Sequence, residues 1–131
     1  MKSLDTNIVL RLLLQDVPEQ TQKVVTLIDD SKPGSLQVVD AVFFECAWIL
    51  SGPYYDFDRE LIGKMLLQVT AIPQINCNRT MLEKAVPQYA ARPALSFIDS
   101  CLAVQAGLNE AVPLLTFDRK LAQQLPQAKL L

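Results

Sequence analysis

The chain opens with Lys2-Ser3-Leu4-Asp5-Thr6-Asn7-Ile8, a stretch in which a short strand gives way to a helix. The strand is predicted over Lys2 to Leu4, three polar residues interrupt it, and good helix formers follow from Ile8 to Gln15. A strand that passes directly into a helix is the unit from which parallel sheets are built. Asp5 would then lie at the carboxyl end of the first strand.

The same alternation continues along the chain. Further helices are predicted over residues 18–28, 41–50, 59–69, 78–91 and 97–106 and briefly after residue 118, and further strands over residues 36–39, 72–75, 112–116 and 128–130. We therefore expect an α/β fold, with a central parallel sheet of four to five short strands flanked by helices. In such sheets the functional site lies outside the carboxyl ends of the strands.

Several residues mark the expected ends and weak points of these elements. Asp40, Asp58 and Ser96 are each predicted to cap the helix that follows. Pro73 makes the third strand weak or places it at an edge, and Pro87 is expected to kink or break its helix.

The composition is that of one folded domain. Residues 1–131 are 50% hydrophobic and 20% charged, which excludes a disordered chain and suits a single domain of this length. No apolar run approaches the roughly 18 residues that a membrane span needs, so we expect a cytoplasmic protein with no membrane partner. The three cysteines form no C-x-x-C pair, and we expect reduced thiols in the core.

The chain contains no histidine. It therefore cannot build a Ser-His-Asp or Cys-His catalytic unit, or the usual histidine-bearing zinc site. Any chemistry must depend mainly on carboxylates. The net charge of -2 provides no general attraction for nucleic acid, so contact with a polyanion would need a local basic patch or bound cations.

Four acids stand in apolar surroundings in the sequence. Glu45 and Asp99 lie within helices that are apolar on most sides, and Asp5 and Asp118 directly follow predicted strands. We expect burial of Glu45 in particular, and an ionised carboxylate in a low dielectric needs a positive partner.

Two explanations for these acids are open. Each acid could pair with its own lysine or arginine, but only Arg11 and Arg119 lie near the four segments. A shared metal site explains all four acids together. Carboxylate oxygens favour Mg²⁺ or Mn²⁺, and such ions promote phosphodiester hydrolysis without a histidine base.

The segments around these acids resemble those of a known family. They are Leu4-Asp5-Thr6-Asn7-Ile8, Phe44-Glu45-Cys46-Ala47-Trp48-Ile49-Leu50, Phe97-Ile98-Asp99-Ser100-Cys101-Leu102-Ala103 and Leu115-Thr116-Phe117-Asp118-Arg119-Lys120-Leu121. In this order they resemble the PIN domain over nearly the whole chain, and more closely its VapC-type branch, the ribonuclease toxins of bacterial toxin-antitoxin pairs.

The resemblance implies a metal-dependent endoribonuclease that uses Mg²⁺ or Mn²⁺ at Asp5, Glu45, Asp99 and Asp118, which act as both metal ligands and catalytic residues. It also implies an RNA substrate, a homodimer and a small antitoxin that occludes the site. Many relatives carry a further acid three residues before the equivalent of Asp99, where this chain has Ser96. The missing acid weakens the expectation of a second bound metal ion more than the expectation of the first.

Two alternative hypotheses for the function are open. The chain could be a PIN nuclease of RNA processing without a toxin role, or a non-catalytic RNA-binding or interaction module of the same fold. A haloacid dehalogenase phosphatase fits poorly because Asn7 stands where a second aspartate is expected, and a receiver domain fits poorly because Asp5 has no adjacent acid.

Secondary candidates for ligand contact each have a structural alternative. Asn7 and Thr116 could bind ligands or metal waters, although Asn7 could equally cap the first helix. Arg119 and Lys120 could contact phosphate or form a solvated surface pair. The aromatic loop of residues 54–57 could stack on bases or pack at a subunit interface.

Overall fold

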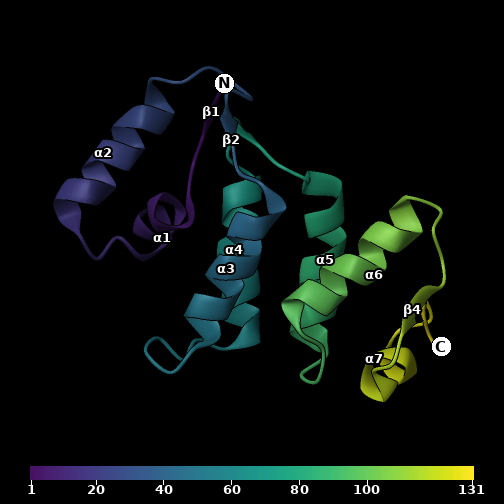
Figure 1. Cartoon of the computed structure of the whole chain (residues 1–131). Coiled ribbons are helices and arrows are strands. Elements are labelled where there is room, and N and C mark those ends of the chain that lie inside the picture. The colour runs from purple at the N-terminus through teal and green to yellow at the C-terminus, as the bar shows by residue number, and fades with distance from the viewer. The chain divides into compact units, whose positions relative to one another are not determined.

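Short parallel strands alternate with helices throughout the computed structural model, which describes residues 1–131 (Figure 1). The chain divides into two units, Met1–Arg79 and Thr80–Leu131. No helix in either unit combines the length and the apolar character that crossing a membrane requires.

The first unit is built on a three-stranded parallel sheet. Its elements are β1 (Lys2–Ser3), α1 (Thr6–Leu14), α2 (Pro18–Asp29), β2 (Leu36–Gln37), α3 (Asp40–Ser51), α4 (Arg59–Thr70) and β3 (Ile75–Asn76). β2 is the central strand, because Leu36 pairs with Lys2 on one side and with Ile75 on the other. All three strands run in the same direction, so the residues that follow them leave the sheet at one edge.

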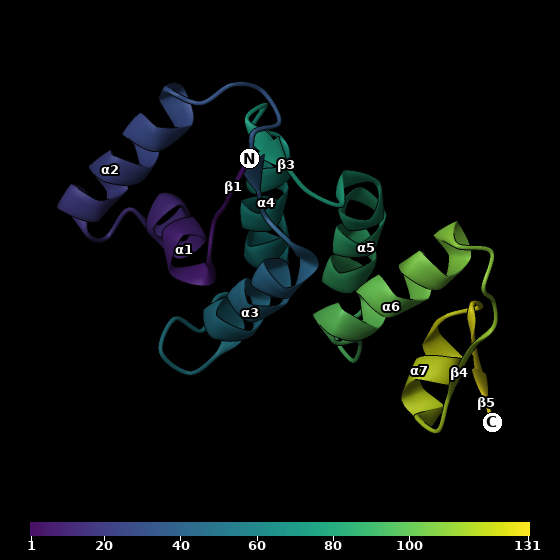
Figure 2. The ribbon, with the colours of Figure 1, turned by 45° about the horizontal axis from the view of Figure 1, so that its top comes forward.

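Helices pack around this sheet through buried aliphatic and aromatic side chains. α3 packs against α1 and α4, which Figure 2 shows beside it, and α1 also packs against α2. The largest fully buried side chains of this unit include Phe43, Leu50, Ile62 and Leu66. Pro18 lies in the first turn of α2, where its missing N–H costs no hydrogen bond.

The second unit contains two helices followed by a small β-α-β segment. Its elements are α5 (Arg79–Ala91, which begins on the last residue of the first unit), α6 (Phe97–Leu108), β4 (Leu114–Thr116), α7 (Arg119–Gln124) and β5 (Ala128–Leu130). β4 and β5 pair in parallel, and α7 packs on both strands (Figure 2).

Two sets of contacts hold the second unit together. An apolar cluster joins α6, α7 and β5 and consists of Leu95, Ala103, Leu121, Leu125 and Ala128, with Leu114 packed against it. Between α5 and α6 the buried Ser100 hydroxyl donates to the Ala85 carbonyl at 2.8 Å and accepts the Gln88 amide N–H at 2.9 Å.

The α/β class and the parallel strands are confirmed, with differences in detail. The five strands form one sheet of three and one of two, where a single central sheet was expected. The third strand begins only at Ile75, because Pro73 cannot donate to a ladder and lies just before it. Pro87 does not break α5, which runs on to Ala91.

The predicted N-caps are confirmed at two helices and wrong at the third. The Asp58 carboxylate accepts the Leu61 N–H at 2.8 Å, and the Ser96 hydroxyl accepts the Asp99 N–H at 3.0 Å. Asp40 is not a cap: it is the first residue of α3, and Val39 before it supplies no side-chain hydrogen bond.

Candidate acidic site

Asp5 connects β1 to α1. Its backbone is extended, and its carboxylate Oδ1 accepts the Ile8 N–H at 3.0 Å, so the side chain caps α1. This bond satisfies one of the free N–H groups of the first turn. The side chain is exposed and its second oxygen has no partner in the chain. Asp5 therefore combines a structural bond with a free carboxylate oxygen at the carboxyl end of a strand.

Glu45 lies on the exposed face of α3, which contradicts the expected burial. The helix buries Val42, Phe43, Cys46, Ala47 and Leu50, and it leaves Glu45 exposed. The prediction is wrong because the apolar composition of this helix does not mean that every face is covered: Trp48, one turn from Glu45, is 80% exposed. Glu45 accepts no hydrogen bond within the chain, so both of its oxygens are available.

Asp99 lies in the first turn of α6 and is half-buried. Its backbone N–H donates to the capping hydroxyl of Ser96. A carboxylate at this position interacts favourably with the positive end of the helix dipole. Its side chain has no hydrogen bond or ion pair in the chain.

Asp118 follows β4 and caps the short helix α7. Its Oδ1 accepts the N–H groups of Lys120 at 2.9 Å and Leu121 at 3.2 Å, and its own N–H donates to the Thr116 hydroxyl at 3.0 Å. The carboxylate is exposed. Like Asp5, it uses one oxygen to begin a helix after a strand and leaves the other free.

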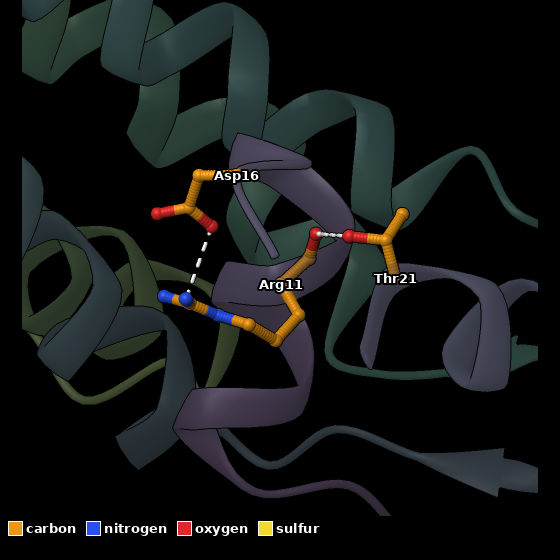
Figure 3. Close-up of polar contacts among 3 residues, drawn as sticks. All are labelled: Arg11, Asp16 and Thr21. Atoms are coloured by element: carbon orange, nitrogen blue, oxygen red, sulfur yellow. Dashed lines mark hydrogen bonds and ion pairs between the residues drawn. The ribbon is translucent and has the colours of Figure 1, made fainter. Parts of the chain in front are cut away.

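The nearby basic residues do not neutralise these acids. Arg11 forms an ion pair with Asp16 at 3.0 Å, while its carbonyl accepts the Thr21 hydroxyl (Figure 3). Lys64 pairs with Glu60 one turn earlier on α4. None of the four candidate acids takes part in an ion pair within its own unit, so the explanation by separate salt bridges finds no support there.

The four acids are divided between the two units. Asp5 and Glu45 belong to the first unit, and Asp99 and Asp118 belong to the second. Neither unit brings together three carboxylate or thiol side chains that could hold a metal ion. The hard oxygen donors and the lack of cationic partners fit Mg²⁺ or Mn²⁺. Burial provides no argument for a metal ion, because Asp99 is half-buried and the other three acids are exposed.

The thiol beside Glu45 is not a candidate nucleophile. Burial, together with the smaller effect of the negative charge of Glu45, raises the pKa of Cys46 to about 12. A thiol with this pKa stays protonated near neutral pH, and the thiolate is the reactive form. Cys46 and Cys101 are buried thiols, as expected, whereas Cys77 is only half-buried.

The secondary candidates for ligand contact are either engaged in local contacts or exposed. Asn7 does not cap α1, since Asp5 does, and the Thr116 hydroxyl is bonded to the Asp118 N–H. Arg119 and Lys120 are exposed. In the aromatic loop, Tyr54 is 88% exposed, and its ring meets Tyr55 edge-on with centroids 4.7 Å apart.

Sequence reasoning missed a polar cleft in the first unit. Its volume is about 540 Å³, and it is lined by Gln37, Val38, Val39, Asp40, Ala41, Asn76, Cys77 and Asn78. These residues end the neighbouring strands β2 and β3, follow them, or begin α3. The sequence contains one indication of this cleft, because Asp40 and Asn78 each come after a predicted strand. From the sequence, both residues are interpreted only as the starts of helices.

The PIN domain family matches residues 3–124 of the chain. The chain therefore belongs to the PIN domain family, whose fold is of the nuclease type. No curated protein and no solved structure matches it significantly.

Proposed function

We propose that this chain is an endoribonuclease that requires Mg²⁺ or Mn²⁺ and uses Asp5, Glu45, Asp99 and Asp118 as its acidic residues. One observation carries the proposal: in a chain of the PIN family, the four acids of the motifs that resemble the family have no cationic partner within their own unit. Each of them keeps at least one carboxylate oxygen free of hydrogen bonds within the chain.

The positions of these acids suit cation binding. Asp5 and Asp118 are held in place by the N–H groups that their Oδ1 atoms accept, so each side chain is ordered before any ligand arrives. A bound divalent cation would offset the negative charge that develops on a phosphodiester during hydrolysis. The cation also explains how a chain with a net charge of -2 could accept RNA.

Proton transfer would also depend on carboxylates, since the chain has no histidine and the Cys46 thiol stays protonated. Glu45 suits this role best, because it is exposed and neither of its oxygens is engaged. It can orient the attacking water and accept its proton.

The test is cleavage of a fluorescent single-stranded RNA by the purified chain. We expect cleavage in Mg²⁺ or Mn²⁺, none in EDTA, and loss of activity in Asp5→Asn and Glu45→Gln. Asp29→Asn is the matched control, because Asp29 is an exposed aspartate at the end of α2 that forms no ion pair. Full cleavage in EDTA would overturn the metal requirement. RNA binding without cleavage in any metal would favour a non-catalytic module.

We further propose that the chain is the toxin of a VapC-type toxin-antitoxin pair, acts in the cytoplasm as a homodimer, and is inhibited by a small antitoxin. The four-motif resemblance supports this assignment. Toxicity on expression separates it from a PIN nuclease of RNA processing, which should not arrest growth.

A further inference from the structure

The polar cleft of the first unit is lined by neither Asp5 nor Glu45, the two candidate acids of that unit. It opens where β2 and β3 end, at the edge of a parallel sheet where α/β proteins bind ligands. Its volume of about 540 Å³ falls within the usual range for small-molecule sites.

The lining of the cleft combines one carboxylate with amides and an apolar wall. Asp40 is half-buried, and its Oδ2 accepts the side-chain amide of Asn78 at 3.3 Å. Its Oδ1 has no partner, and no lysine or arginine lines the cleft. Val38 and Val39 supply apolar surface beside these polar groups.

We propose that this cleft binds a guanine base of the RNA substrate, a specificity site that rests on the proposed nuclease function. A carboxylate only accepts hydrogen bonds, and guanine presents two adjacent donors, N1–H and the 2-amino group, on its Watson–Crick edge. Gln37 and Asn76 also line the cleft, and their side-chain amides are hydrogen-bond donors of the kind that guanine O6 accepts.

The other bases fit this lining less well. Uracil places carbonyl oxygens on both sides of its single N–H, and these oxygens would repel Asp40. Adenine and cytosine each place a ring-nitrogen acceptor next to their amino group, which also opposes a carboxylate. A cleft whose only charged side chain is a carboxylate with one free oxygen therefore favours guanine over the other three bases.

Nucleotide binding to the full chain tests the site without requiring cleavage. The probes are GMP, IMP, AMP, CMP and UMP in EDTA, and binding is followed by amide chemical shifts in NMR spectra. We expect GMP to shift residues 37–41 and 76–78, and to bind at least about tenfold more tightly than AMP. IMP lacks the 2-amino group and should bind more weakly than GMP.

Substitutions locate the binding site. Asp40→Asn replaces an acceptor oxygen by an N–H donor and should weaken GMP binding about tenfold, while Asp29→Asn should leave it unchanged. If Asp40→Asn fails to fold, Asn76→Ala takes its place, since the only hydrogen bond of the Asn76 side chain is a weak one of 3.9 Å to the Met1 sulfur. Equal binding of all five nucleotides, or shifts only outside the cleft, would overturn the proposal.

A cleavage assay in Mg²⁺ separates this proposal from the proposed function. Cleavage next to a single guanine should be lost when adenine replaces that guanine, and Asp40→Asn should remove the difference between the two RNAs. Specific GMP binding with no cleavage of any RNA would leave the site standing and refute the nuclease. Cleavage that ignores guanine would refute the site alone.

Discussion

Asp5 has two separable roles, because one carboxylate oxygen caps α1 and the other is free. Asparagine caps helices about as well as aspartate, so Asp5→Asn should change the free energy of unfolding by less than about 0.5 kcal/mol. Asp5→Ala removes the cap and should cost about 1 kcal/mol. Both variants should lose RNA cleavage by at least about 100-fold, because both remove the charge that would bind a cation.

Urea denaturation and the RNA cleavage assay measure the two roles separately. Global unfolding of Asp5→Asn would show that the acid is needed for the fold. Unchanged cleavage by the same variant would remove Asp5 from the active site.

The raised pKa of the Cys46 thiol gives a second prediction for a single residue. With its pKa raised to about 12, only about one thiol in a thousand is ionised at pH 9 in the folded chain, against half in the unfolded chain with the ordinary value of 9.0. The raised pKa also means that this group's contribution to stability is present below pH 9 and is lost as the pH rises toward 12.

Alkylation by iodoacetamide at pH 9, read by mass spectrometry, measures this difference. We expect Cys46 to be modified quickly in 6 M urea and hardly at all in buffer. Rapid modification of the folded chain would contradict the buried, protonated thiol.

At the scale of elements, the sequence predicts the order and type of the helices and strands better than it predicts which of their side chains are exposed. The strand-helix alternation located every helix, because apolar periodicity and capping residues such as Asp58 and Ser96 are local signals. The exposure of Glu45 could not be read from α3, since an apolar composition does not say which face is covered. Asp40 was misassigned for a related reason: the partner of its carboxylate, Asn78, is 38 residues away.

Local sequence patterns also do not show which of the four acids share a site. The resemblance to the PIN domain implies that the four acids converge, and their convergence is part of the proposed function. Asp5 and Asp118 were identified because each follows a strand, which is a local pattern.

The start of α6 offers a gain-of-function test. Ser96 caps this helix where many relatives carry an acid, and Asp99 lies one turn further on. Ser96→Asp keeps a capping oxygen and adds a carboxylate, so the helix should remain intact while the apparent affinity for Mn²⁺ rises on the order of tenfold. Ser96→Ala, which loses the cap without adding charge, should cost about 1 kcal/mol of stability and leave metal affinity unchanged.

Isothermal titration with Mn²⁺ and thermal melting measure these two effects. An unchanged Mn²⁺ affinity in a folded Ser96→Asp variant would argue that Asp99 does not bind metal.

At the scale of the whole molecule, the toxin proposal predicts a partner of definite chemistry. An antitoxin that occludes four acids should place an arginine among them, because guanidinium bonds carboxylates bidentately and replaces the charge that a metal would supply. Expression of the wild-type chain alone should arrest bacterial growth. Asp99→Asn should not, and co-expression of the neighbouring open reading frame should restore growth. Harmless expression of a soluble, folded wild-type chain would remove the toxin role.

The central claim is that Asp5, Glu45, Asp99 and Asp118 bind a divalent cation together. Crystals of the full chain soaked in Mn²⁺ test it most directly, because the anomalous signal locates the ion without assuming any activity. The account predicts a Mn²⁺ peak about 2.0 to 2.3 Å from carboxylate oxygens of these four residues, and its disappearance in Asp5→Asn. No peak among them, or lysine and arginine side chains paired with the four acids instead, would contradict the account.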